Sequence, residues 1–266
     1  MTDTPESMTY GDYLALEPIL SAQHPISPHH DEMLFIIIHQ TKELWLKQII
    51  HELRLAKRLV RDDALVEVHK ALSRVSRIQS VMTLSWDVLA TLTPTDYTSF
   101  RDVLGSSSGF QSVQFRQMEY MLGTKDGSHL RHHETGSAPH TSLADELSSP
   151  SLWDEANAAL ARAGFSLPEA VLTRDWSTPY QPSAAVEEGW AEVYRDTERW
   201  WPLYQLAERL VDIDDALATW RHKHVVTVER IIGLKRGTGG TAGVAYLQST
   251  LAKRAFPELW SLRTKV

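Results

Sequence analysis

The chain has 266 residues, of which 42% are hydrophobic and 23% are charged, and its formal net charge is −7. This composition suits a globular protein with a sizeable core and excludes disorder as a description of the whole chain. The sequence contains no cysteine, which excludes disulfides, thiolate-bound metals and a cysteine nucleophile. Acidic residues outnumber basic ones, so the net charge does not favour binding to nucleic acid.

The first residues, MTDTPESMTYGDYL, are acidic and polar, whereas a signal peptide starts with basic residues followed by an apolar stretch. The longest apolar run, residues 34–38, is far shorter than the roughly 20 residues that cross a bilayer as a helix. We therefore expect a soluble, cytoplasmic protein with no membrane partner.

Two long amphipathic helices are predicted in the first third of the chain. Apolar residues recur every three or four positions over residues 30–60 and again over residues 64–92, with charged residues between them. The first helix begins with acidic residues and ends with basic ones, which suits the helix dipole. The second helix ends at Thr93-Pro94.

The same Thr93-Pro94 pair predicts the start of a third, short helix that closes at Gly105, because threonine is a good N-cap and proline suits the first helical position. Beyond it we expect, in chain order, a helix, an exposed polar loop, a pair of moderate helices and an irregular stretch, over residues 110–122, 123–140, 143–163 and 165–183.

Helical periodicity resumes in the last third of the chain. We expect one helix over residues 184–210 and a second over 212–233, opened by three acidic residues, Asp212, Asp214 and Asp215. A glycine-rich loop (residues 234–245) and a last helix (244–255) follow. No segment alternates like a strand, so we predict one all-α domain over residues 1–266, with residues 1–28 as an N-terminal arm.

Two of the twelve histidines, His39 and His224, lie on the apolar stripes of their helices, and Phe35 precedes His39 by one turn. A helical domain can enclose a flat cofactor between helices, with one histidine as the axial ligand and another on the open side. The alternative is that each is a hydrogen-bonded core residue.

The H-x-x-H-H run in the polar loop could bind zinc, but no carboxylate at a fixed spacing supports it.

Two further features favour a binding site for a small carboxylate. Arg101 follows Tyr97 by one helical turn, and a guanidinium beside a phenol can hold both oxygens of a carboxylate. The alternative is that Arg101 pairs with Asp96 or Asp102 at the surface. The glycine-rich loop resembles a dinucleotide fingerprint, but a helix precedes it where a strand is required. We interpret it as a mobile lid carrying Thr238, or else as a flexible connector.

Long strings of residues, distributed over nearly the whole chain, resemble the haem-dependent tryptophan 2,3-dioxygenase family and occur in the family's order. These strings are YGDYL (10–14), HDEMLFIIIHQTKELWLKQIIHEL (30–53), SGFQS with QFR (108–116), HVVTVER (224–230), GTGGT (237–241) and FPELW (256–260). The resemblance implies an all-α homotetramer with one haem b per subunit. It also implies that the protein oxidises L-tryptophan with O₂ to N-formylkynurenine.

The resemblance also implies roles for individual residues. His224 is similar to the family's axial ligand of the haem iron, and Trp86, Ser108 and Gly109 are similar to residues that lie against the haem. On the substrate side, His39 is similar to the distal histidine that faces the indole N–H, which suggests an orienting, hydrogen-bonding role.

The remaining matches concern the substrate. Phe35 is similar to the aromatic residue that packs beside the indole, Arg101 to the arginine that pairs with the substrate carboxylate, with Tyr97 near it, and Thr238 to a loop threonine at the amino-acid end. The resemblance further implies that two tyrosines of the arm reach into a neighbouring subunit's pocket, namely Tyr10 and Tyr13.

The chain departs from the family pattern at Ala242 and Ala245 of the loop, and residues 123–183 resemble the family only loosely. Alternatives therefore stay open at this point. A haem monooxygenase of the same fold would insert one oxygen atom into tryptophan or a derivative and give a 2-oxindole. A haem-free helical binding protein would hold no porphyrin, and a zinc hydrolase would use the histidines of residues 129–140.

Overall fold

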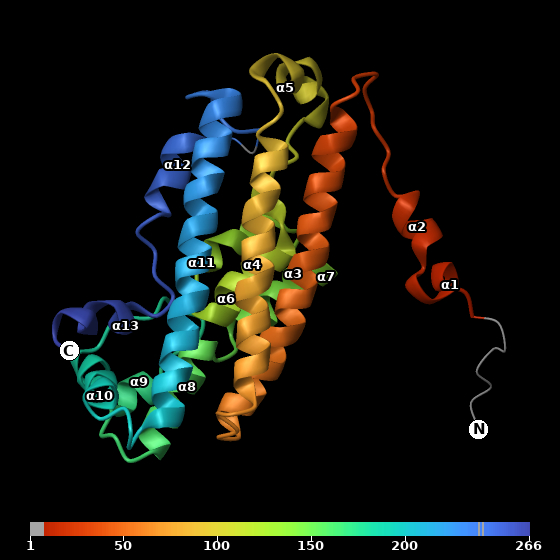
Figure 1. The fold of residues 1–266 in the computed structure, drawn as a ribbon. Coiled ribbons are helices and arrows are strands. Elements are labelled where there is room, and N and C mark those ends of the chain that lie inside the picture. The colour runs from red at the N-terminus through yellow and green to blue at the C-terminus, as the bar shows by residue number, and fades with distance from the viewer. Residues whose placement is uncertain (1–7, 239, 241) are drawn as a thin grey trace.

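The computed structural model describes residues 8–238, 240 and 242–266, and over these ranges it contains helices and no strand. Three long helices, α3 (Glu32–Arg61), α4 (Val68–Leu89) and α11 (Trp201–Ile232), run side by side with α4 in the middle (Figure 1). The prediction of an all-α fold is confirmed.

Shorter helices cover the long ones. α6 (Val113–Leu122) and α8 (Leu152–Arg162) pack against α3, and α7 (Ala138–Leu147) packs against α6. α5 (Pro94–Arg101) and α12 (Val244–Ser249) both contact α11. α5 and the end of α11 lie at the same end of the bundle (Figure 1), so they bring segments that are far apart in the sequence close together.

The remaining helices lie at the other end of the bundle or in connections. α10 (Ala184–Arg195) and α13 (Pro257–Ser261) pack against each other near the C-terminus (Figure 1). The short elements are α1 (Tyr10–Leu14), α2 (Leu16–Leu20), α9 (Glu169–Leu172) and the 3₁₀ turns η1 (Asp102–Leu104), η2 (Gly109–Gln111), η3 (Gly127–His132) and η4 (Leu262–Thr264).

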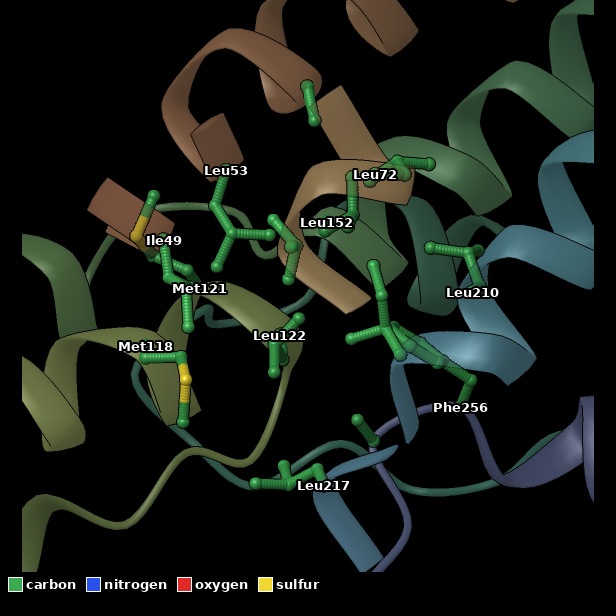
Figure 2. Packing of buried hydrophobic residues seen from close by; sticks show 14 of the residues in the cluster. Ile49, Leu53, Leu72, Met118, Met121, Leu122, Leu152, Leu210, Leu217 and Phe256 are labelled. Carbon is green, nitrogen blue, oxygen red and sulfur yellow. The ribbon is translucent and has the colours of Figure 1, made fainter. Parts of the chain in front are cut away.

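The hydrophobic core lies where the long helices meet α6 and α8 (Figure 2). Ile49 and Leu53 of α3, Leu72 of α4 and Leu210 of α11 are each 0% exposed. Burial of such a side chain contributes about 1.5–3 kcal/mol. This packing holds the three long helices in fixed positions relative to one another, and therefore also the side chains near their ends.

The start of α5 follows the predicted capping pattern. The Thr93 backbone N–H donates to Asp96 Oδ2 at 2.8 Å, and the Asp96 backbone N–H donates to Thr93 Oγ1 at 3.2 Å, with Pro94 in the first turn. This reciprocal arrangement satisfies two backbone donors that a helix start otherwise leaves free. It also engages Asp96, one of the carboxylates that we considered as a partner for Arg101.

The predicted boundary between the last two long helices is wrong. α11 runs without interruption from Trp201 to Ile232, and the break lies earlier, at residues 196–200, before Pro202 in the first turn of α11. The three aspartates do not open a helix. Asp212 pairs with Arg209 at 2.8 Å. Asp214 is 0% exposed and is engaged by the C-terminal segment, through the Trp260 indole N–H at 2.9 Å and a backbone N–H at 3.1 Å.

Residues 123–140 are only in part the exposed loop that their polarity predicts. They include the 3₁₀ turn η3, and His129 within it is buried. The Tyr120 hydroxyl of α6 donates to the Asp126 carbonyl at 2.6 Å, which ties the segment to the bundle. Among the described residues, no group of three or more histidine, aspartate or glutamate side chains is placed to hold a metal ion, so the zinc interpretation receives no support.

Two smaller differences concern segment ends. α4 begins at Val68, later than predicted, and α12 ends at Ser249, earlier than predicted. The N-terminal arm forms α1 and α2 and projects away from the bundle (Figure 1); its first seven residues lie outside the described ranges. None of the described helices combines the length and the apolar character that a membrane crossing requires.

Candidate functional site

One cavity of about 670 Å³ lies among α3, α4, α5 and α11 and the loops near their ends. Its size falls within the range of about 300–1,000 Å³ that is usual for small-molecule and cofactor sites. The structure places nine of the eleven sequence-predicted site residues in its wall: Phe35, His39, Trp86, Tyr97, Arg101, Ser108, Gly109, His224 and Thr238.

Tyr10 and Tyr13 are the two predicted site residues that do not line this cavity. Both lie on α1 in the arm, and each is 76% exposed. The structure therefore does not bring the arm tyrosines to the cavity of their own chain.

His224 lies on α11 and presents a neutral imidazole to the cavity. Its ring stacks on the indole of Trp86, with centroids 4.4 Å apart and planes inclined by 13°, and lies 5.1 Å from the ring of Trp220. Burial lowers the pKa of His224 to about 3. Within the described part of the chain no side chain or backbone group forms a hydrogen bond with its ring. A neutral imidazole with an available lone pair is what iron ligation requires.

His39 lies on α3 and presents a second imidazole. Its Nδ1 lies 2.7 Å from the backbone carbonyl oxygen of Phe35, and since a carbonyl can only accept, Nδ1 carries the proton. Burial lowers the pKa of His39 to about 4, so the ring is neutral near pH 7 and its Nε2 is an acceptor. The Phe35 ring packs against the imidazole at a centroid distance of 4.2 Å. Such an acceptor suits a heteroaromatic N–H.

Lys42 lies one helical turn after His39 and was not singled out from the sequence. It is only 7% exposed, and its Nζ sits 3.0 Å from the centroid of the Trp86 ring. Burial lowers the pKa of Lys42 to about 7. The signal available in the sequence was a lysine three residues after His39, on the same helical face.

The end of the cavity near α5 carries the predicted carboxylate clamp. The Arg101 guanidinium donates to the backbone carbonyl of Arg236 in the glycine-rich loop, and Thr238 Oγ1 donates to the Ser107 carbonyl at 2.7 Å. Arg101 forms no ion pair with an acidic side chain among the described residues, so the surface pairing considered above is not seen. The phenol of Tyr97 is partly buried beside Arg101, and burial raises its pKa.

The described residues of the glycine-rich loop lie close to one another at this end of the cavity. Gly243 has φ +61°, and a Cβ at this position would lie 2.5 Å from the carbonyl oxygen of Lys235, closer than any real contact. Gly237 and Thr238 line the cavity, whereas Gly239 and Thr241, which the lid prediction includes, lie outside the described residues.

A buried charge network forms another part of the wall. Glu119 of α6 accepts from Arg116 at 2.5 Å and from Arg221 of α11 at 3.0 Å. Burial by itself would raise the pKa of Glu119, but the two guanidiniums hold it below its usual value.

A second carboxylate, Glu43 of α3, accepts from Ser112 Oγ at 2.6 Å and from Gln114 Nε2 at 2.8 Å. None of these residues was assigned a role in the site from the sequence.

The cavity also has features that fit a porphyrin. Among the described residues, five buried polar atoms of its lining residues have no hydrogen-bond partner: Lys42 Nζ, Trp86 Nε1, Arg116 Nε, Trp220 Nε1 and Thr227 Oγ1. Buried polar groups are ordinarily satisfied, so such a cluster indicates a polar ligand. These unpartnered hydrogen-bond donors and the neutral imidazole of His224 together suit a haem, which carries carboxylates.

Comparisons with known proteins agree with this chemistry. The family model described as tryptophan 2,3-dioxygenase matches residues 1–140 and 147–266. The tryptophan 2,3-dioxygenase of Caulobacter vibrioides is 63% identical over 261 residues, which cover 98% of this chain and 99% of that protein. The protein of the same name from Ralstonia pickettii is 52% identical, with 98% and 94% covered. The chain belongs to the tryptophan 2,3-dioxygenase family.

Proposed function

We propose that the protein is a haem-dependent dioxygenase that cleaves the C2–C3 bond of the indole ring of L-tryptophan with O₂ and gives N-formylkynurenine. The observation that carries the proposal is a single cavity lined by two neutral imidazoles, His224 from α11 and His39 from α3, with Arg101 at one end. Family membership, with relatives named tryptophan 2,3-dioxygenase at 52–63% identity, supports the same activity.

His224 would hold the iron of the haem, with Trp86, Ser108 and Gly109 against the porphyrin. The bound haem supplies the binding of O₂ and the oxidation of the indole. The Trp86 stack keeps the imidazole of His224 in one orientation. Because the pKa of His224 is far below neutral, its lone pair is available over the whole physiological pH range.

The chain's own contribution to the reaction is orientation of the substrate. Arg101 would pair with the substrate carboxylate through both oxygens, with Tyr97 beside it and Thr238 near the amino-acid end. To do so, the guanidinium exchanges the Arg236 carbonyl for the carboxylate, which has a full charge and is the better acceptor. Binding of substrate is thereby coupled to the position of residues 234–245, which we propose act as a lid.

His39 would accept a hydrogen bond from the indole N–H at Nε2, while the Phe35 ring packs beside the indole. The Phe35 carbonyl holds the proton on Nδ1 and so determines which nitrogen faces the substrate. With a pKa of about 4, His39 is a weak base, and we assign it an orienting role instead of proton abstraction.

The alternative outcome, insertion of one oxygen atom to give a 2-oxindole, is not favoured. The curated relatives at 52–63% identity carry the name of the dioxygenase. Ring cleavage therefore remains the proposed reaction.

We also propose that the chain assembles as a homotetramer in which the arm (residues 1–28) of one subunit reaches the cavity of another. The arm carries apolar and aromatic side chains that the described residues of their own chain leave largely exposed, including Tyr10, Tyr13 and Leu20. Further apolar side chains are exposed on α3 and α4, among them Leu44 and Leu84 at 52% and 66% exposed. Exposed apolar side chains in such numbers support the proposal that these faces are covered by other subunits.

The test of the activity is product mass. The protein expressed with a haem supply is reduced, mixed with L-tryptophan and isotopically labelled O₂, and the product is identified by mass spectrometry. We expect N-formylkynurenine with two labelled oxygen atoms. A product with one labelled atom, or a purified protein that takes up no porphyrin, would overturn the proposal.

A further inference from the structure

Lys42 carries a buried amino group that forms no ion pair among the described residues. Among the described residues its Nζ has no hydrogen-bond partner, and it lies 3.0 Å from the centroid of the Trp86 ring. The cation–π contact compensates only part of the hydration that the ammonium group loses, because such contacts contribute about 2 kcal/mol when desolvated. An uncompensated charge at a buried site is costly. The site is therefore complete only when an anion is present.

No carboxylate of the described cavity wall is available to supply that anion. Glu43, the residue next to Lys42, is engaged by Ser112 and Gln114. Glu119 is engaged by two arginines and lies in the separate charge network. The counter-ion for Lys42 must then come from a bound ligand.

The position of Lys42 distinguishes between the carboxylates that a ligand could bring. Its Nζ lies over the Trp86 indole, whose ring also stacks on the imidazole of His224, and Lys42 follows His39 by one turn of α3. A group that lies between two imidazoles on opposite helices is the porphyrin, whereas the amino acid would lie on the His39 side only. The substrate carboxylate also has its own partner in Arg101, near the glycine-rich loop.

We propose that the ammonium group of Lys42 binds a propionate carboxylate of the bound haem. This inference rests on the proposed function, because it requires that the cavity hold a porphyrin. Lys42 then acts as an anchor for the cofactor in addition to the axial imidazole, and the Trp86 face is the position where its ammonium group rests when no carboxylate is bound.

The test compares haem with its dimethyl ester, in which both carboxylates are blocked and the iron is unchanged. Each is titrated into the apoprotein, and the affinity is read from the absorption of the bound porphyrin. Wild type should bind haem more tightly than the ester by roughly tenfold to a hundredfold, as expected for a hydrogen bond between charged groups. Lys42→Met should lose most of this preference, and Lys42→Arg should keep it.

Lys47→Met is the matched control, because Lys47 lies on the same helix and is exposed. It should leave the preference for haem unchanged. A second readout is thermal unfolding of the apoprotein, in which Lys42→Met should raise Tm because a buried, unpaired charge is removed. A merely structural lysine would give a lower Tm.

Two results would overturn the inference while leaving the proposed function intact. One is a wild-type protein that binds haem and its ester equally well. The other is a Lys42→Met variant that retains the preference for haem and instead shows a raised KM for L-tryptophan, which would assign Lys42 to the substrate. A wild-type protein that binds neither porphyrin would overturn the proposed function and this inference together.

Discussion

The imidazole of His224 lies almost parallel to the indole of Trp86, with ring centroids 4.4 Å apart and planes inclined by 13°. The two residues come from different long helices, α11 and α4, which pack along much of their length. The packing of these helices therefore holds the imidazole ring, and with it the lone pair of His224, in one direction. A ligand held in one orientation by its surroundings is a prerequisite for a well-defined metal site.

Replacement of this imidazole should abolish tight haem binding. We expect His224→Ala to be purified without haem or with loosely held haem, because the remaining contacts provide no axial ligand. The measurement is the ratio of haem absorption to protein absorption after gel filtration. His222→Ala is the control, since His222 is exposed on the same helix, two residues away. Full haem content and activity in His224→Ala would contradict the assignment.

Removal of the Arg101 guanidinium should weaken substrate binding more than it changes the haem. We expect Arg101→Leu to raise the KM for L-tryptophan by roughly tenfold to a hundredfold, the factor for a lost hydrogen bond between charged groups. The haem absorption spectrum should stay close to that of wild type. Tryptamine, which lacks the carboxylate, should be a poor substrate for wild type and should not be affected further by Arg101→Leu. Equal turnover of tryptamine and tryptophan by wild type would argue against the clamp.

The buried network around Glu119 should be sensitive to loss of its single carboxylate. Glu119→Gln leaves Arg116 and Arg221 without a counter-ion, and we expect the free energy of unfolding to fall by about 3–5 kcal/mol. Urea unfolding of the apoprotein measures this without interference from cofactor binding. The control is Glu188→Gln, because the Glu188–Arg195 pair is exposed and screened by water, so its loss should leave the free energy of unfolding nearly unchanged. Similar stabilities for the two variants would show that the network is not a structural requirement.

The apoprotein should lose stability in mild acid, in part because of His129. Burial lowers the pKa of His129 to about 4, against 6.5 for the ordinary side chain. Between these values the unfolded chain binds a proton at this residue and the folded chain does not, so stability falls as the pH drops from about 6.5 to about 4. His129→Gln should flatten the dependence of Tm on pH over this window. His51→Gln, at an exposed position, should leave it unchanged, and a steeper dependence in His129→Gln would contradict the expectation.

Local and periodic features of the fold were accessible from the sequence. The apolar stripes of α3 and α4 and the capping box of Thr93 and Asp96 depend on residues within a few positions of one another. The same stripes place His39 and His224 on buried helical faces. Wrong assignments concern residues whose contacts are distant in the sequence: Asp214 lies buried within α11, where the Trp260 indole N–H donates to its carboxylate, and His129 is buried because its segment packs on the bundle.

The sequence by itself therefore determined the helical class, most of the long helices and the pair of histidines on apolar faces, because helix formation follows a repeat of three to four residues. Only the tertiary structure decided that Phe35, Tyr97, Arg101, Trp86 and Thr238 line the same cavity as these histidines. It also showed that Lys42 is buried without an anion, whereas Glu43 beside it is fully engaged. Whether a charge is compensated depends on contacts between segments far apart in the chain, and residue spacing does not contain that information.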